Sequence, residues 1–238
     1  MCFRKVRKGK SVGKCDEEEL VGMNKSFCDN REYWDEYYGH IHSEIQNSTQ
    51  FASFIVEKWL DNRRSIVEYG CGNGRDCRYF RKRGLDVTGV DSSKVTIEHL
   101  RKEMEDCDFV CADFSAEEWI PKRKFDVVYS RFSIHAISLK KEIGMLENAY
   151  NCLNQNGIFC IEARSINDDL YGKGKKVGED EYIYNNHYRR FARLGNLLQR
   201  LIEQGFDIRY AEENKGFAPL DGEDPSIIRI VCEKVSRI

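Results

Sequence analysis

Three closely spaced glycines and a later aspartate are the residues of this chain best suited to chemistry. The segment SIVEYGCGNGRDCRYF begins at Ser65 and contains Gly70, Gly72 and Gly74. Its pattern is that of an apolar strand, a tight turn and an amphipathic helix. Such a turn can bring bare backbone and a positive helix end up to a ligand. Asp91 ends the next apolar run and can accept hydrogen bonds from a ribose, so we predict a nucleoside-type cofactor site.

The spacing of the glycines distinguishes between cofactors. The dinucleotide fingerprint G-x-G-x-x-G requires a third glycine where this chain has Arg75 or Cys77. The motif is instead E-x-G-x-G-x-G from Glu68, which resembles the first motif of class I S-adenosylmethionine-dependent methyltransferases. A purely structural turn is one alternative interpretation. A nicotinamide-dependent oxidoreductase on a related fold is another.

Length and composition suit one α/β domain. The chain has 238 residues and a formal net charge of −2, so no overall field favours nucleic acid. No apolar run approaches the ~20 residues of a membrane span, and we expect a cytoplasmic protein without a membrane partner. The ten cysteines include no C-x-x-C pair, so we expect reduced thiols and no metal site. Cys71 is the one cysteine for which a thiolate is considered, because it precedes a helix N-terminus.

Strand and helix patterns alternate along the chain and predict a Rossmann-like α/β fold. We expect a seven-stranded, mostly parallel sheet with helices on both faces. One strand should be antiparallel, because the link between the last two strands is too short for a crossover. The expected strands are 65–69, 86–90, 107–111, 125–130, 157–163, 206–212 and 227–233, and the expected helices are 48–60, 75–83, 93–105, 140–153 and 192–204.

The resemblance implies a single methyltransferase domain over residues 27–238, preceded by a mobile arm over residues 1–26. Residues 27–62 are expected to include lid-forming helices, with Tyr33 and Tyr37 over the cofactor. The basic N-terminal arm lies outside the resemblance, so its role is not inferred.

Acidic residues at strand ends mark the expected cofactor side of the sheet. Asp91 is assigned to the ribose, and capping of the next helix by Asp91 or Ser92 is the alternative. The resemblance implies that Asp113 contacts the adenine amine and that Phe114 lies against the ring, with a surface turn as the alternative. The predicted cofactor-binding residues are Tyr33, Tyr37, Glu68, Gly70, Cys71, Gly72, Asn73, Gly74, Asp91, Ser92, Asp113, Phe114 and Ser130.

The fourth expected strand, FDVVYSRFSIHAI, leads to the substrate side. It lacks the Pro-Pro-aromatic tetrapeptide of many amino methyltransferases, and no Pro-Cys pair is present for pyrimidine-carbon methylation. Arginines and histidines gather here and in an expected substrate-side insertion over residues 165–190, and paired arginines suit carboxylate or phosphate. The predicted catalytic residues are Arg131, His135, His187, Arg189 and Arg190, and the predicted substrate-binding residues are Arg131, Arg164, Tyr188, Arg189 and Arg190. A solvated charged face and structural histidines are the alternatives.

A closer resemblance rests on the segments CGNGRD, YSRFSIHAI, HYRRF and EDPSIIRI. These are similar to a tellurite-resistance-type subgroup found among polysaccharide and capsule biosynthesis enzymes. The resemblance implies S-adenosylmethionine as cofactor. We expect methyl transfer to a small anionic acceptor, on an oxygen of a phosphate-like or sugar-linked group. An RNA methyltransferase, which the basic arm favours, and a non-catalytic binder remain alternatives.

Overall fold

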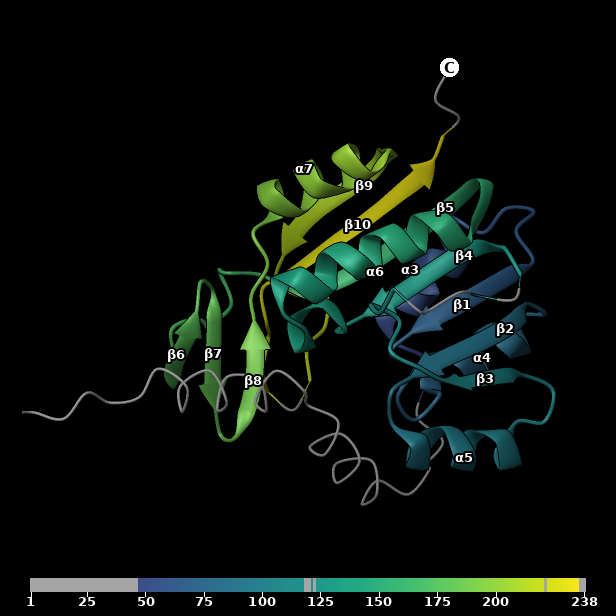
Figure 1. Ribbon diagram of the computed structural model, residues 1–238, viewed down its shortest axis with the longest axis horizontal. Coiled ribbons are helices and arrows are strands. Elements are labelled where there is room, and N and C mark those ends of the chain that lie inside the picture. The colour runs from purple at the N-terminus through teal and green to yellow at the C-terminus, as the bar shows by residue number, and fades with distance from the viewer. Residues whose placement is uncertain (1–46, 118–120, 122, 221, 236–238) are drawn as a thin grey trace, which may run out of the picture.

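The computed structural model describes residues 47–117, 121, 123–220 and 222–235 (Figure 1). The expected mobile arm and the lid residues Tyr33 and Tyr37 lie outside these residues. The helices are α3 (Gln50–Lys58), α4 (Arg75–Lys82), α5 (Lys94–Glu103), the 3-10 helix η1 (Ile134–Ala136), α6 (Leu139–Cys152) and α7 (Leu194–Gln204). The strands are β1 (Ser65–Tyr69), β2 (Asp86–Asp91), β3 (Asp108–Cys111), β4 (Phe125–Arg131), β5 (Leu153–Arg164), β6 (Lys175–Gly178), β7 (Glu181–Tyr184), β8 (His187–Arg190), β9 (Phe206–Asn214) and β10 (Ile227–Lys234).

Seven of the described strands form one sheet in the order β3-β2-β1-β4-β5-β10-β9. The pairs β1–β2, β1–β4, β2–β3 and β4–β5 are parallel. Strand β10 runs antiparallel to both of its neighbours, β5 and β9. The prediction of a mostly parallel sheet with one reversed strand is therefore confirmed.

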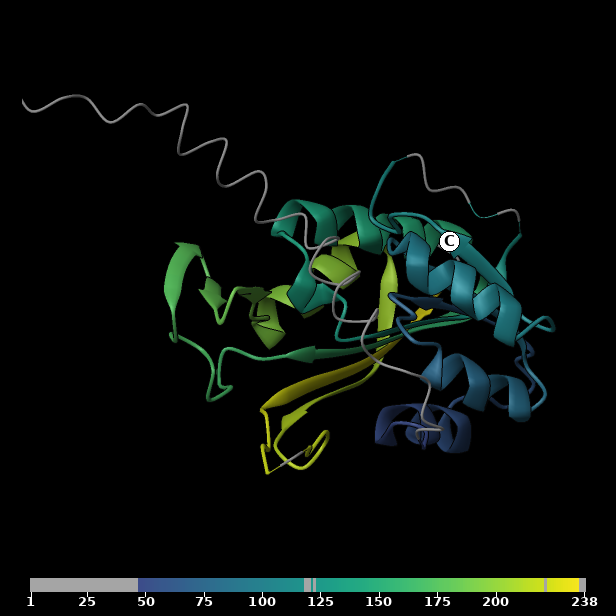
Figure 2. The ribbon, with the colours of Figure 1, turned by 90° about the horizontal axis from the view of Figure 1, so that it is seen from below.

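Two apolar layers cover the sheet, one on each face. Alternate residues of β4 enter different layers: Val127 and Tyr129 pack with residues of α3, α4 and α5, whereas Val128 packs with residues of α6 and α7. Figure 2 shows α3 and α6 on opposite sides of the sheet. Burial on both faces explains why the central strands are continuous apolar runs in the sequence.

The segment expected to be an insertion contains strands that the sequence interpretation did not include. Strands β6, β7 and β8 form a separate three-stranded antiparallel sheet. Its end is tied to the end of β5, because Ala192 N donates to Arg164 O at 2.9 Å and Ile166 N donates to Ala192 O at 3.0 Å. Strand β8 also contacts η1, the turn that follows β4. The small sheet therefore adjoins the carboxyl ends of β4 and β5 (Figure 1).

Further features of the described residues bear on the expectations from composition. None of the described helices is long and apolar enough to cross a membrane. No group of three or more metal-ligating side chains comes together in this part of the chain. The described cysteines are free thiols, and most of them are buried.

Candidate functional site

The loop from β1 to α4 adopts a backbone that requires glycine at three positions. Gly70, Gly72 and Gly74 have φ angles of 73°, 49° and 71°, in the left-handed region that residues with a Cβ disfavour. Gly70 N and Cys71 N both donate to Val90 O, at 2.8 and 3.1 Å. The loop is thus fixed to the end of β2.

The space beside two of these glycines is occupied by the protein itself. A Cβ on Gly70 would lie 2.4 Å from Ser133 Oγ, and a Cβ on Gly74 would lie 2.6 Å from Leu100 Cδ2. These two glycines therefore leave room for neighbouring side chains of the protein. The expectation that the glycine loop also exposes backbone to a ligand stays a prediction. Ser133 Oγ donates to Tyr69 O at 2.6 Å, and it thereby ties the end of β1 to the segment after β4.

Asp91 lies at the end of β2 and holds the glycine loop. Its Oδ2 accepts Gly72 N at 3.0 Å, and its Oδ1 accepts Ser93 N at 2.9 Å. The cap of α5 is Ser93, whose hydroxyl accepts Thr96 N. The alternative that Asp91 or Ser92 caps this helix is therefore wrong. The ribose contact of Asp91 stays a prediction.

Glu68 is buried near the end of β1. Burial, followed by the nearby Asp76 carboxylate, raises the pKa of Glu68 well above its ordinary value. Cys77 Sγ donates to Glu68 Oε2 at 3.0 Å. The hydrogen bond with Cys77 lowers the pKa of Cys71. Burial and the Asp91 carboxylate raise it by more, so that the pKa of Cys71 is about 11. Cys71 is therefore a neutral thiol, and a reactive thiolate is not supported.

Asp113 follows β3 and carries a negative charge. Its Oδ2 forms an ion pair with Lys141 Nζ at 2.9 Å, and its Oδ1 accepts Ser115 N at 2.9 Å. Burial raises the pKa of Asp113, but the hydrogen bonds from Ser115 and Lys141 lower it more, so it lies below its ordinary value. The Phe114 ring is buried and stacks on Tyr69, with centroids 5.2 Å apart. Their adenine contacts stay predictions.

Three further predicted cofactor residues lie at the same edge of the sheet. Asn73 Oδ1 accepts Arg75 N at 3.3 Å, and Ser92 O accepts Cys111 Sγ at 3.7 Å. Ser130 is fully buried near the end of β4, and its hydroxyl has no hydrogen-bond partner among the residues that the structure describes. A buried hydroxyl of this kind calls for an explanation, and a bound ligand is one.

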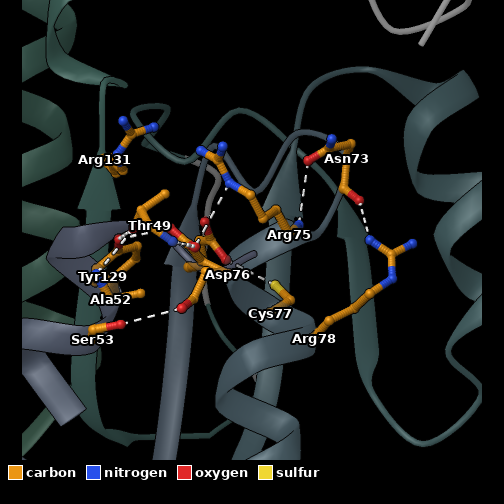
Figure 3. Close-up of polar contacts among 12 residues, drawn as sticks. Thr49, Ala52, Ser53, Asn73, Arg75, Asp76, Cys77, Arg78, Tyr129 and Arg131 are labelled. Carbon is orange, nitrogen blue, oxygen red and sulfur yellow. Dashed lines mark hydrogen bonds and ion pairs between the residues drawn. The ribbon is translucent and has the colours of Figure 1, made fainter. Parts of the chain in front are cut away.

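Asp76, in the first turn of α4, anchors α3 beside the glycine loop (Figure 3). Its carboxylate accepts Thr49 N at 3.0 Å, Thr49 Oγ1 at 2.8 Å and Tyr129 OH at 2.8 Å. Figure 3 shows Arg75 and Arg131 extending to the same side of this network. The sequence analysis did not include Asp76 among the site residues. The local indication of this network was Thr49 at the start of a helix, because threonine is typical of an N-cap.

An aromatic residue with an unusual backbone separates β4 from η1. Phe132 has a φ of 58°, which is rare for a bulky residue and is often found at functional sites. The guanidinium of Arg131 lies 4.1 Å from the centre of the Phe132 ring, and that of Arg164 lies 5.7 Å from it. Arg131 Nε donates to Glu162 Oε1 at 2.8 Å, and Glu162 also accepts Arg229 Nε at 2.7 Å. The ends of β4 and β5 are thus joined by a buried carboxylate.

His135 and His187 are 5% and 7% exposed, respectively. Burial, followed by the charge of Arg164, lowers the pKa of His135 well below its ordinary value. Burial, followed by the charge of Arg189, lowers the pKa of His187 to about 3. Both imidazoles are therefore neutral at physiological pH. His135 Nδ1 has no hydrogen-bond partner within the described part of the chain.

Three of the predicted arginines lie close enough to His135 for their charges to lower its pKa. Arg131, Arg164 and Arg189 each act on its imidazole through their charge. Arg164 Nη1 is paired with the buried Asp168 at 2.8 Å. Arg189 is half-buried. These three cations form the basic side of the candidate site.

Arg190 has a different environment from the other predicted arginines. It is buried and forms an ion pair with the buried Glu142 of α6. Tyr188 is also buried in the interior. The side chain of Arg190 is 6% exposed, against 18% for Arg131 and 15% for Arg164, and its Nε and Nη2 donors are used inside the protein. The basic side therefore consists of Arg131, Arg164 and Arg189 without Arg190.

Carboxyl and guanidinium side chains therefore lie in adjacent parts of the molecule, at the carboxyl ends of β1 to β5 and in the adjoining strand β8. The acidic side lies at β1, β2 and β3 and can accept hydrogen bonds from hydroxyl and amine groups. The basic side lies at β4, β5 and β8 and can bind an anion. The acidic side comprises Glu68, Asp91 and Asp113, and the basic side comprises Arg131, Arg164 and Arg189.

Comparison with known proteins identifies the type of domain. The chain matches a family model described as a methyltransferase domain over residues 32–210. It is 24% identical over 125 residues to the trans-aconitate 2-methyltransferases of Escherichia coli strain SE11 and Shigella flexneri. Each alignment covers 52% of this chain and 48% of the relative, so the chain spans about half the length of the curated relatives it matches.

Solved structures share the fold at low sequence identity. The Burkholderia thailandensis 1,6-didemethyltoxoflavin-N1-methyltransferase, with bound 1,6-didemethyltoxoflavin and S-adenosylhomocysteine, has a TM-score of 0.62 at 18% identity, covering 96% of this chain and 94% of that one. A TehB-like S-adenosylmethionine-dependent methyltransferase from Corynebacterium glutamicum has a TM-score of 0.58 at 18% identity, covering 92% and 100%. The glycopeptide N-methyltransferase MtfA, complexed with S-adenosylmethionine, has a TM-score of 0.60 at 17% identity, covering 80% and 96%.

Proposed function

This chain belongs to the class I S-adenosylmethionine-dependent methyltransferases, and we propose that it transfers the methyl group to an oxygen of a small anionic acceptor. One observation carries the proposal: the guanidinium groups of Arg131 and Arg164 lie 4.1 and 5.7 Å from the centre of the Phe132 ring, which itself lies 5.3 Å from the ring of the buried His135. Together with Arg189, these arginines lower the pKa of His135 through their charges. The family match sets aside the nicotinamide-dependent alternative, which the glycine spacing already opposed.

The residues of the acidic side fit the cofactor of this family. Asp91 accepts two backbone N–H groups, and a carboxylate offers about four acceptor positions, so it can also accept ribose hydroxyls. Asp113 is negatively charged and suits an amine donor. The buried hydroxyl of Ser130 would gain a partner. When bound, S-adenosylmethionine supplies a methyl group on a positively charged sulfur atom.

On the basic side, the chain contributes binding and orientation. Planar guanidinium groups match pairs of carboxylate or phosphate oxygens. Holding two reactants in the correct geometry can supply roughly 7–11 kcal/mol of the barrier reduction. An ionised acceptor oxygen needs no base, and the low pKa of His135 suits it to orient the acceptor rather than to remove a proton.

The finer assignment concerns the kind of anion. We place the acceptor oxygen on a phosphate-like or sugar-linked group, as the tellurite-resistance-type subgroup among capsule enzymes suggests. The relatives named for trans-aconitate, which is a small carboxylate anion, support the anionic class. The likeness to the TehB-like structure supports the shared fold.

The test is a labelled-methyl screen. Purified protein is incubated with methyl-labelled S-adenosylmethionine and separate sets of sugar phosphates, nucleotide sugars, metalloid oxyanions, trans-aconitate and RNA, and the labelled product is identified by mass spectrometry. We expect the label in one anionic class. Label in RNA would instead establish an RNA methyltransferase, and cofactor binding without any labelled product would establish a non-catalytic binder.

A matched pair of variants ties the activity to the basic side. Arg189→Gln should raise the KM for the labelled acceptor about tenfold or more, because it removes a charged hydrogen-bond donor. It should leave the Kd for S-adenosylmethionine within about twofold, since the acidic side is intact. Lys176→Gln, at an exposed position of β6, is the control and should change neither value. An unchanged KM in Arg189→Gln would remove this arginine from the acceptor site.

A further inference from the structure

A fully buried carboxylate connects three elements near the basic side. Glu142 lies in the first turn of α6, and its side chain is 0% exposed. It forms ion pairs with Arg190 of β8 and with Arg200 of α7, the latter at 2.6 Å between Arg200 Nε and Glu142 Oε1. A buried carboxylate is stable in its ionised form only when it is paired and hydrogen-bonded, and both partners provide this.

Arg190 uses its remaining donors on the backbone around His135. Arg190 Nε donates to Ile137 O at 3.0 Å, and its Nη2 donates to Ile134 O at 3.4 Å. These two carbonyls lie on either side of His135 in η1, a helix of only three residues. A turn this short has few hydrogen bonds of its own, so the guanidinium contributes directly to its conformation.

Strand β8 also carries Arg189, one of the three arginines of the basic side. Alternate residues of a strand point to opposite faces, which separates His187 and Arg189 from Tyr188 and Arg190. Arg189 acts on the imidazole of His135 through its charge, and His187 does so only when it is protonated, whereas Arg190 is buried against Glu142. The interior contacts of Arg190 therefore fix β8 and η1 relative to each other.

We propose that Arg190 and Glu142 are positioning residues, which clamp η1 to β8 and so set the distance between His135 and the pair His187–Arg189. This inference rests on the proposed function, because it assigns these groups to the acceptor site. It gives Arg190 a role behind the site, in place of the direct contact with the acceptor that the sequence predicted. Arg190 is 5% exposed, and its Nε and Nη2 donors already have partners inside the protein.

The test compares Arg190→Lys with Arg200→Lys. Both variants keep a positive charge beside Glu142, but lysine lacks the planar fork that reaches several acceptors at once. Arg200 pairs with Glu142 from α7, whereas the hydrogen bonds to the Ile134 and Ile137 carbonyls come from Arg190, so Arg200 is the matched control. The first readout is the pH titration of the histidine ring nitrogens by NMR. The chain has only 5 histidines, so His135→Gln and His187→Gln variants assign the two signals.

The groups that face His135 are Arg131 of β4, Arg164 of β5, and His187 and Arg189 of β8. In the unaltered protein we expect both histidines to stay neutral down to about pH 5, since their pKa values lie below the ordinary value of about 6.5. In Arg190→Lys the site should admit water, and both pKa values should rise by about one unit or more. Arg200→Lys should leave them unchanged.

The second readout uses inorganic phosphate as the probe. Phosphate should shift the signals of His135 and His187 in the unaltered protein, and Arg190→Lys should weaken its affinity about tenfold while the S-adenosylmethionine Kd stays within about twofold. If Arg190→Lys does not fold, Glu142→Gln replaces it under the same criteria. Unchanged histidine titrations in Arg190→Lys, or equal changes in Arg200→Lys, would overturn the clamp. Absence of any phosphate effect would instead count against the proposed anion site, while the titrations still decide the clamp.

Discussion

At the scale of single residues, the two buried histidines have properties set by their surroundings. A free imidazole titrates near pH 6.5, but burial and the adjacent arginines disfavour the protonated form of His135 and His187. A bound anion would compensate those arginine charges and raise both pKa values. Binding of the proposed anionic acceptor should therefore change the titration of both histidines.

The low pKa of His187 predicts a loss of stability in acid. Its pKa is about 3 in the folded protein, below the unfolded value of about 6.5, so the unfolded state binds more protons between these pH values. The contribution of His187 to the free energy of unfolding is fully present above about pH 6.5, and it decreases as the pH falls toward 3. By about pH 5 the loss is on the order of 2 kcal/mol.

Urea unfolding at about pH 7.5 and about pH 5 measures this effect. His187→Gln should reduce the difference in unfolding free energy between the two conditions by roughly the stated amount. His99→Gln, on the exposed surface of α5, is the control and should leave the difference unchanged. An identical pH dependence in His187→Gln and the unaltered protein would show that His187 does not cause the acid sensitivity.

The glycine loop gives a second prediction at this scale. Gly70 and Gly84 both have positive φ, 73° and 84°, but a Cβ on Gly84 would meet no atom within 4 Å. Gly84→Ala should therefore lower the free energy of unfolding only by the cost of a left-handed backbone for alanine, about 1–2 kcal/mol. Gly70→Ala should cost about 1–3 kcal/mol more, because its Cβ would displace Ser133 Oγ. Thermal or urea unfolding compares the two, and equal losses would refute the tight contact with Ser133.

The positions of single residues were predictable where they follow from the order of residues along a strand. Asp91 and Asp113 lie at or just after strand ends, so their place at the ligand edge follows from a parallel sheet. The partner of Arg190 was not predictable, because Glu142 is 48 residues away and HYRRF gives no local indication of it. Strand alternation would have separated Arg189 from Arg190, but it applies only once β8 is recognised as a strand.

At the scale of elements, the long strands follow from their apolar runs and the short ones do not. Strands β6, β7 and β8 have four residues each, too few for a clear alternating pattern. The missed signal was Asn185-Asn186, whose φ angles of 51° and 57° match the two-residue hairpin turn that asparagine favours. Strand β5 begins at Leu153 rather than 157, because α6 runs into it without a turn.

The docking of α3 beside the glycine loop yields a prediction at this scale. Thr49→Val keeps the shape of the side chain but removes the helix cap, worth about 1 kcal/mol, and the hydrogen bond to Asp76, worth about 1.5–3 kcal/mol. We expect an unfolding free energy lower by about 2–4 kcal/mol in urea. Ser48→Ala is the control, because the Ser48 hydroxyl contacts only Ser53 Oγ, at 3.2 Å, among the described residues. Equal effects of the two substitutions would contradict the anchoring role of Asp76.

At the scale of the whole molecule, the sheet places two different binding chemistries at one edge. Carboxylates lie at or near the carboxyl ends of β1, β2 and β3, and arginines lie at the ends of β4 and β5 and in β8 of the small sheet. The reversed strand β10 and its neighbour β9 extend the sheet on the side away from β3. The proposed cofactor and acceptor sides are therefore built from consecutive parts of the chain, with the β6–β8 sheet added to the proposed acceptor side alone.

The charge distribution of the molecule predicts which anions it binds. The chain carries 38 basic and 40 acidic residues, yet three arginines gather around one buried imidazole. Nucleic acid binding needs many phosphate contacts over an extended basic surface, whereas a small anion needs only such a local cluster. Inorganic phosphate should therefore compete with the acceptor in the labelled-methyl assay, and a short RNA should not.

Inhibition measured across a range of salt concentrations decides between these cases. Arg189→Gln should reduce phosphate inhibition about tenfold, because it removes one charged donor from the cluster, and Lys176→Gln should not affect it. Strong inhibition by RNA that weakens steeply with salt would mean that many phosphate contacts form. That result would restore the RNA methyltransferase alternative, with the basic residues of the N-terminal arm as the first to be substituted.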